Sequence, residues 1–353
     1  MFFVSCNFSW KAKNKLIYDR YYESVKIIIA SRKAFNNEWR CTMNETINSS
    51  LKLKYDSLLS ALQSLGSVAV AFSGGVDSTF LLYAAKEALG DAAIAVTISA
   101  DFVSNREQTE AKEFCKEHGI RQYICPANMT EIPHFTENPT DRCYYCKRHI
   151  FENILKIAGE HFISDGATSD DSATPNKKDS FVVAEGSNLD DNNDYRPGHR
   201  AIAELGIKSP LRDAGFTKAE IREVSRYLGL PTWQKPSFAC LASRIPYGDI
   251  ITTEKLSMID KAENFLQSLG FSQFRVRFHG GRGGAGNGAI DGGPQNDAAR
   301  GSIARIELMP EDFQRFMEES TRLEVYERFK EIGFSYVALD IKGYRTGSLN
   351  EGL

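Results

Sequence analysis

The chain has 353 residues, of which 25% are charged and 42% are hydrophobic, and its formal net charge is −3 at pH 7. This length predicts about two domains with a sizeable core, and the charge balance lacks the basic excess of nucleic-acid-binding proteins. No run approaches the ~18 apolar residues of a membrane span, and seven irregularly spaced cysteines do not suggest a disulfide framework. We therefore expect a cytoplasmic protein that binds neither nucleic acid nor a membrane.

The chain begins with residues 1–50, a mixed basic and aromatic extension to which the sequence assigns no function. A first predicted helix over 55–65 leads to the apolar run 68–72, which a short polar sequence with two glycines follows at once. Apolar residues with helical spacing begin at Phe80, so this order predicts a buried strand, a tight turn and a helix N-terminus. The turn residues are the first candidates for ligand contact: Ser73, Gly74, Gly75, Val76, Asp77, Ser78 and Thr79.

This turn has the features of an anion cradle. The amides of residues 74–78 would point outward at the positive end of the helix dipole, and the Asp77 carboxylate is a ligand of the kind that Mg²⁺ prefers. An ordinary glycine turn with a serine cap is the alternative. A Walker loop is excluded because its lysine is missing. The string 73–78 instead resembles the PP-loop of the ATP pyrophosphatase superfamily, which implies cleavage of ATP between its α- and β-phosphates.

Strands and helices alternate after this turn. The sequence predicts a buried strand over 93–99, a helix over 104–118 that a capping box at Ser104 and Glu107 opens, and a short strand over 123–125. Further on, a second capping box at Thr217 and Glu220 starts a predicted helix that ends at Leu228. This order predicts an α/β fold with a parallel, doubly wound sheet. Such sheets bind ligands beyond the carboxyl ends of their strands, where the turn would lie.

A similar pattern occurs twice further along the chain, in the segments 162–171 and 182–191. Each has apolar residues, then a glycine, then two adjacent aspartates. We favour the second segment as the functional one. Its Asp190 and Asp191 are candidates for contact with Mg²⁺ or AMP, although a helix-capping role is equally consistent with the sequence.

We expect three parts in the chain: the N-terminal extension 1–50, a PP-loop ATP-binding domain over 51–235, and a smaller C-terminal α+β domain over 236–353 for substrate and sulfur transfer. The elements predicted in the last part are helices over 254–269, 312–317 and 323–332 and strands over 274–278, 303–308 and 336–339. Two insertions interrupt the domains, at 168–180 and at 280–300. The second contains G-x-G-x-x-G, but no helix follows, so a pyrophosphate site is not expected there.

Three cysteines are candidates for sulfur or metal chemistry. Cys143 and Cys146 form a C-x-x-C pair at the start of a predicted helix, and Cys240 lies in a loop between prolines. The pair alone is compatible with a redox site, half of a zinc site, cluster ligands or two unrelated thiols. Three thiolates suit a [4Fe–4S] cluster that leaves one iron open to an external ligand. Cys115 and Cys125 fit as small buried hydrophobic residues.

Six motifs together point to one family: the PP-loop, the segment 186–198, the tetrapeptide 208–211, the cysteine loop 236–244, the strand 274–279 and the tetrapeptide 304–307. They resemble the LarE family from about Leu51 to Leu339. The resemblance implies an ATP-dependent sulfur transferase of nickel-pincer cofactor biosynthesis, whose substrate is a pyridinium biscarboxylate mononucleotide. It implies adenylation of a carboxylate and displacement of AMP by sulfur from sulfide or another sulfur donor. In some members the cysteine that matches Cys240 is sacrificed, whereas in others three cysteines hold a [4Fe–4S] cluster. Cys143 and Cys146 place this chain with the second kind.

The resemblance and the residue chemistry together suggest further site residues. Cys240, Arg244 and Asp77 would act in catalysis, with Arg244 neutralising the α-phosphate. Arg275 and Arg277 lie two apart on a strand and so share a face, where they could bind a phosphate or a carboxylate. A charged, exposed sheet face is the alternative for these two arginines. The family also implies a homo-oligomer.

Other functions remain open at this stage. A PP-loop tRNA thiolase combines the same loop with cluster cysteines, but the charge balance disfavours it. An amidotransferase or an NAD-synthetase-like ligase would not need the three cysteines. A nucleotide-binding sensor without turnover would not need Asp77 and the arginines.

Overall fold

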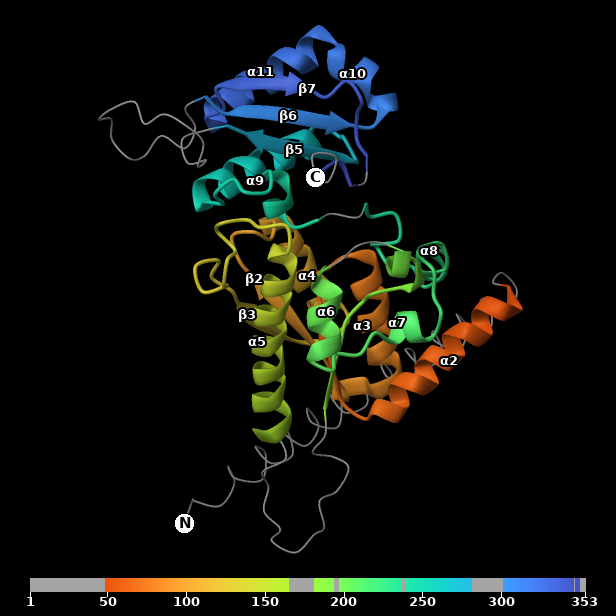
Figure 1. The fold of residues 1–353 in the computed structure, drawn as a ribbon. Coiled ribbons are helices and arrows are strands. Elements are labelled where there is room, and N and C mark those ends of the chain that lie inside the picture. Colours follow the sequence, from red (N-terminus) through yellow and green to blue (C-terminus); the bar gives the residue numbers. More distant parts are fainter. Residues whose placement is uncertain are drawn as a thin grey trace, which may run out of the picture.

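The computed structural model describes residues 48–164, 181–193, 197–236, 239–280, 301–345 and 347–349 of the chain. Two sheets organise these residues (Figure 1). Three of the predicted features lie outside the described residues: the extension up to residue 47, the insertion at 168–180, and residues 281–300 of the glycine-rich insertion. Within the described residues, no helix has the length and apolar character needed to cross a membrane.

The first sheet is parallel, with the strand order β3-β2-β1-β4. Its strands are β1 (Val68–Ala71), β2 (Ala93–Ser99), β3 (Arg121–Pro126) and β4 (Val182–Ala184). Val68 pairs with Ala93 on one side and with Val182 on the other, so the chain moves outward through β2 and β3 and then crosses back to the far side of β1. Open α/β sheets bind ligands at this point of reversal. The predicted doubly wound α/β fold is confirmed.

Helices cover both faces of this sheet. They are α2 (Ser49–Leu65), α3 (Val76–Leu89), α4 (Asn105–Glu117), α5 (Arg142–Ser164), α6 (Pro197–Glu204), α7 (Pro210–Asp213) and α8 (Lys218–Tyr227), with the short 3₁₀ turns η1 (Gly90–Ala92) and η3 (Leu189–Asn193). On β1, Val68 and Val70 pack with α2 and α3, whereas Ala69 packs in a second cluster that includes α5. Because successive strand side chains point to opposite faces, this sheet is buried on both sides.

The second sheet has three strands in the order β5-β6-β7. Strands β5 (Phe274–His279) and β6 (Ile303–Leu308) are antiparallel, and β7 (Tyr336–Leu339) runs parallel to β6. The helices of this region are η4 (Leu241–Arg244), α9 (Thr253–Ser268), η5 (Pro310–Asp312), α10 (Phe313–Met317) and α11 (Glu319–Ile332). Helices α9 and α11 contact each other and pack on the same apolar face of the second sheet, and Figure 1 shows this unit above the first sheet. The second, smaller α+β unit predicted from the sequence is therefore present.

One apolar cluster joins the second sheet to the loops of the first. It contains the inward side chains of β5 and β6 and also Phe102, Ile132 and Phe135, which follow β2 and β3. Leu241 and Ala242 of η4 belong to the same cluster. The carboxyl edge of the first sheet is therefore packed directly against the second unit, and the cysteine turn lies at this junction.

Two local predictions have different outcomes. The capping box at Thr217 and Glu220 is present, with both reciprocal hydrogen bonds. Ser104 does precede α4 as its N-cap, but its side chain makes no capping hydrogen bond. Residues 162–164 belong to the end of α5, and the rest of the first copy of the repeated pattern lies outside the described residues. In the second copy, Val182–Ala184 forms β4 beside β1, and the loop that follows it reaches the PP-loop.

Candidate active site

The PP-loop connects β1 to α3 as the sequence predicts. Gly74 has a φ of +70°, and Gly75 is the extended N-cap of α3. The hydroxyl oxygens of Ser73 and Ser78 are 3.1 Å apart, and the Ser78 hydroxyl also donates to the Gly75 carbonyl at 3.2 Å. Because Gly75 brings no capping side chain, the first-turn amides of α3 are left to hydrogen-bond a ligand. Thr79, in contrast, is fully buried.

The loop after β4 closes against the start of α3. A Cβ added to Gly186 would lie 2.9 Å from the Ser78 nitrogen and 3.2 Å from the Asp77 Cβ, so only glycine permits this approach. The Asn188 side-chain amide donates to the Asp77 carboxylate at 3.4 Å. The Lys218 ammonium, from the first turn of α8, forms an ion pair with the same carboxylate. Asp77 is therefore held between an amide and a cation beside the loop amides.

Asp190 and Asp191 have identifiable structural contacts. Asp190 accepts a hydrogen bond at 2.8 Å from the backbone N–H of Lys218, at the start of α8. Asp191 accepts one at 3.0 Å from the backbone N–H of Asn188. Of the two roles that the sequence allows, these contacts favour the capping role. Both residues hold Lys218 and Asn188 in place around Asp77.

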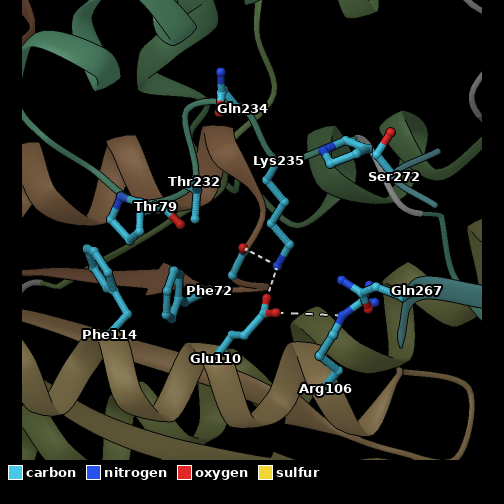
Figure 2. Close-up of a pocket in the computed structure, with 13 residues that line it drawn as sticks. Phe72, Thr79, Arg106, Glu110, Phe114, Thr232, Gln234, Lys235, Gln267 and Ser272 are labelled. Atoms are coloured by element: carbon cyan, nitrogen blue, oxygen red, sulfur yellow. Dashed lines mark hydrogen bonds and ion pairs between the residues drawn. The ribbon is translucent and has the colours of Figure 1, made fainter. Parts of the chain in front are cut away.

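A cavity of about 460 Å³ lies under the PP-loop, between α4 and the segment 231–236. Figure 2 shows the Lys235 side chain reaching across it to α4 and the PP-loop. The Lys235 ammonium donates to the Gly74 carbonyl at 2.9 Å and to the Glu110 carboxylate at 2.5 Å. Burial raises the pKa of nearby Glu107, although the charges of Lys235 and Arg106 oppose this shift. The segment that leads to Cys240 is thus attached to the nucleotide loop.

The turn that presents Cys240 is built around Arg244. The Arg244 Nη1 donates to the carbonyls of Ala239 and Cys240 at 2.8 and 3.4 Å. Its Nε and Nη2 donate to the two Glu263 carboxylate oxygens at 2.8 and 2.9 Å. Burial alone would lower the pKa of Arg244, but the Glu263 carboxylate reverses this shift and raises it. Only 1% of Arg244 is exposed, and its contacts are with the cysteine turn and Glu263; its contact with the α-phosphate stays a prediction.

The three candidate cysteines come together from two distant segments. Cys143 and Cys146 lie in the first turns of α5, and Cys240 precedes η4. Arg142 joins these segments, because its Nη1 donates to the Ala242 carbonyl at 3.2 Å. Burial raises the pKa of Cys146, and the thiols of Cys240 and Cys143 raise it further. Cys143 and Cys240 are exposed and Cys146 is partly buried; the contact of Arg142 with Ala242 and the influence of both other thiols on Cys146 make the three neighbours.

Among the described residues, no group of three His, Cys, Asp or Glu side chains is arranged to hold a metal ion. Cysteine thiolates are the usual ligands of iron–sulfur clusters, so the residue types at this position fit a cluster, whose presence stays a prediction.

Arg275 and Arg277 share the face of β5 opposite the core, but their surroundings differ. The Arg277 guanidinium is buried and donates to both Glu307 oxygens and, at 2.6 Å, to the Ser243 carbonyl. These contacts make Arg277 a support of the cysteine turn. Arg275 is only half-buried and lies over the Tyr344 ring, 4.7 Å from its centroid. Of the two guanidinium groups, that of Arg275 is the more exposed.

The sequence analysis missed several residues at this site. Lys218 and Lys235 bring positive charge to the PP-loop from separate segments, and Asn188 reaches Asp77 across 111 positions. Lys218 follows the predicted capping residue Thr217, so the sequence could have predicted that Lys218 lies at a helix N-terminus. Lys235 has no comparable local pattern.

Comparison with known proteins shows which proteins this chain is similar to in sequence. The NAD synthase family model matches residues 51–141. An uncharacterized protein of Synechocystis sp. is 34% identical over 306 residues, which cover 86% of this chain and 99% of that protein. The pyridinium-3,5-bisthiocarboxylic acid mononucleotide synthase of Lactiplantibacillus plantarum is 33% identical over 304 residues, which cover 86% of this chain and 96% of the synthase. The chain belongs to the LarE family.

The LarE assignment confirms the resemblance found in the motifs. One component of the glutamine-hydrolysing GMP synthase of Thermoplasma acidophilum is 28% identical over 208 residues, which cover 57% of this chain and 64% of that component. That partial match, together with the NAD synthase model, places the chain in the PP-loop superfamily of ATP-using enzymes.

Proposed function

We propose that this chain is an ATP-dependent sulfur transferase that converts the carboxylates of a pyridinium biscarboxylate mononucleotide into thiocarboxylates for the nickel-pincer cofactor. The observation that carries the proposal is the attachment of the cysteine segment to the nucleotide loop. Lys235 contacts Gly74, and Cys240 follows only five residues later. Five residues of chain span at most about 18 Å, so the thiol and the PP-loop serve one site. The identity to the Lactiplantibacillus plantarum synthase supports this substrate class.

The first step is adenylation. A substrate carboxylate oxygen attacks the α-phosphorus of ATP, the bond to the β-phosphate oxygen breaks, and pyrophosphate leaves toward the PP-loop amides. Mg²⁺, if held by Asp77 and the phosphate oxygens, would supply charge neutralisation there. The Lys218 ammonium pairs with Asp77 in this structure and is placed to donate to the phosphates once Asp77 binds the metal. This step makes AMP the leaving group.

The second step is the attack of sulfur on the acyl carbon. The new C–S bond forms as the C–O bond to AMP breaks, and the proton of the thiol or hydrosulfide goes to solvent. If Cys240 is the donor, loss of its Cα proton breaks the Cβ–Sγ bond and leaves dehydroalanine in the chain. If sulfide is the donor, Cys240 is unchanged. Each route balances without an oxidant or a reductant.

Cys143, Cys146 and Cys240 would hold a [4Fe–4S] cluster with one open iron position, and such a cluster would supply a further sulfide for transfer. What the chain itself contributes is the presentation of these thiols. Arg142 and Arg244 hold the two cysteine segments through the carbonyls of Ala242, Ala239 and Cys240.

The test follows each step separately. The purified chain, with ATP, Mg²⁺ and the biscarboxylate mononucleotide, should release pyrophosphate and AMP and give thiocarboxylate by mass spectrometry. Cys240→Ser should keep substrate-dependent pyrophosphate release and lose thiocarboxylate, whereas the matched control Cys125→Ala should keep both. Absence of substrate-dependent pyrophosphate release from the wild type would overturn the proposal, and so would normal product from Cys240→Ser.

A second set of measurements separates the two sulfur routes. Iron and acid-labile sulfide after anaerobic reconstitution, lost in Cys143→Ser, together with many turnovers per chain, would identify the cluster route. A single turnover per chain with dehydroalanine at position 240 would identify the sacrificial route.

A further inference from the structure

Residues 340–345 and 347–348, called the C-terminal segment below, lie over the polar face of the second sheet. After β7, the Gly343 N–H donates to the Asp340 carbonyl at 3.0 Å and closes a turn. The Tyr344 N–H then donates to the Leu308 carbonyl at 2.7 Å. Leu308 pairs with Phe274 across β5 and β6, so this bond places Tyr344 beside the next residue of β5, Arg275.

Both ends of this segment are fixed to the sheet. At one end, the Asp340 carboxylate forms an ion pair of 2.5 Å with Arg305 of β6. At the other, the buried Ser348 hydroxyl donates to the Glu307 carboxylate, 3.1 and 3.2 Å from its two oxygens. Glu307 is also the partner of Arg277. The segment is therefore an integral part of this face.

Arg275 differs in charge balance from the other arginines of this face. Arg277 and Arg305 each form an ion pair with Glu307, but Arg275 has no carboxylate at ion-pair distance among the residues that the structure describes. Its contacts are the Tyr344 ring and, at 3.4 Å, the Arg345 carbonyl, both from the C-terminal segment. A half-buried cation without a counter-charge is costly unless a ligand supplies the charge.

The same segment lies close to the cysteine turn. Tyr344 and Cys240 are both near enough to Arg244 to raise its pKa. Arg244 in turn donates to the Cys240 carbonyl at 3.4 Å. Arg277, two residues further along β5 on the same face, donates to the Ser243 carbonyl at 2.6 Å, so Arg275 lies on the face of β5 that contacts the cysteine turn.

We propose that the C-terminal segment completes the substrate site, with Tyr344 as a positioning residue that holds Arg275 ready for an anionic group of the substrate. The inference rests on the proposed function and deepens it. The group is an oxyanion remote from the reacting carboxyl, either the phosphate of the mononucleotide or its second carboxylate. A ring under a guanidinium restricts its orientation and stabilises its charge, which makes the cation ready to bind before the substrate arrives.

The test compares substitutions of two tyrosines. Tyr344→Leu removes the aromatic face and keeps an apolar side chain, Tyr344→Phe keeps the face, and Tyr336→Leu is the matched control on exposed β7. For Tyr344→Leu we expect KM for the mononucleotide, and its Kd by titration calorimetry, to rise about 5- to 30-fold, the size of a partly desolvated cation–π contact. We expect kcat to change less than KM, and Tyr344→Phe to stay within about twofold of the wild type.

Titration with the dephosphorylated nucleoside identifies the anion. If Tyr344→Leu weakens binding of the mononucleotide but not binding of the nucleoside, Arg275 binds the phosphate. If the substitution weakens binding of both ligands equally, Arg275 binds the second carboxylate. Unchanged binding of both ligands by a stably folded Tyr344→Leu would overturn the inference, as would an equal loss in Tyr336→Leu.

Failure of the inference can be told apart from failure of the proposed function. A wild-type chain that makes thiocarboxylate, with a Tyr344→Leu variant of normal KM, refutes only the role of the segment. A wild-type chain that makes no thiocarboxylate refutes the function, and the calorimetric comparison still decides whether Tyr344 and Arg275 bind an anion.

Discussion

Glu263→Gln should separate the stability of the cysteine turn from its chemistry. Glu263 accepts hydrogen bonds from the Arg244 Nε at 2.8 Å, from its Nη2 at 2.9 Å, and from the Val276 N–H at 3.0 Å. Glutamine has nearly the same shape, but in either orientation its NH₂ group faces one of these donors. The substitution also leaves the guanidinium buried without a counter-charge. Breaking a buried ion pair in this way costs about 3–5 kcal/mol.

The assay is urea unfolding followed by circular dichroism. Glu254→Gln is the matched control, because Glu254 is exposed in the first turn of the same helix and should change the free energy of unfolding by less than about 0.5 kcal/mol. The double variant Arg244→Met/Glu263→Leu removes both charges and should recover most of the lost stability. It should nevertheless lack sulfur transfer, since the Ala239 and Cys240 carbonyls lose their donor.

Two results would refute this reasoning. A loss below about 1 kcal/mol for Glu263→Gln would show that Arg244 finds another partner or water. Normal thiocarboxylate formation by the double variant would show that the Arg244 contacts do not shape the cysteine turn.

Three further predictions concern the PP-loop and the core. Gly186→Ala should cost about 1–3 kcal/mol of stability and weaken ATP binding in a titration, because the new Cβ would meet the Ser78 nitrogen at 2.9 Å; unchanged affinity would contradict the close packing. Lys218→Met should alter stability by less than about 1 kcal/mol, since its pair with Asp77 is partly exposed, yet slow pyrophosphate release about tenfold or more; an unchanged rate would remove Lys218 from the phosphate site. Burial raises the pKa of the Cys115 thiol to about 12, from an ordinary value of 9.0 in the unfolded chain. The contribution of this thiol to the free energy of unfolding is therefore fully present below pH 9 and falls by about 1.4 kcal/mol per pH unit as the pH rises from there toward 12. Cys115→Ala should show a shallower decline of unfolding free energy across that range, and an unchanged slope would contradict this.

Much of the fold could be predicted because local patterns agree with the tertiary structure. The apolar run at 68–72 followed by two glycines specifies strand, turn and helix within a short window, and β1, the loop and α3 lie there. The alternation of strands and helices then restricts the sheet to a doubly wound form. The capping box at Thr217 needs only residues three apart, so it too is visible in the sequence.

The roles of the arginines could not be predicted, because they depend on partners far along the chain. The spacing of Arg275 and Arg277 correctly indicated a shared face, but it could not show that Glu307 neutralises only one of them. Arg244 was expected to meet the α-phosphate, and its burial against Glu263 became visible only in the fold. The capping box expected at Ser104 did not form, since a matching sequence pattern does not guarantee the hydrogen bond.

The apolar cluster shared by the loops after β2 and β3 and by the second sheet bears on how the chain can be divided. A cut at the expected boundary near residue 235 would expose Phe102, Ile132 and Phe135 on one fragment and the inner faces of β5 and β6 on the other. Each fragment would then carry an apolar surface that promotes association. The nucleotide-binding unit of this chain therefore cannot be fused alone to another catalytic domain without exposing this apolar surface. A productive chimera would have to carry the loops after β2 and β3 together with the second sheet.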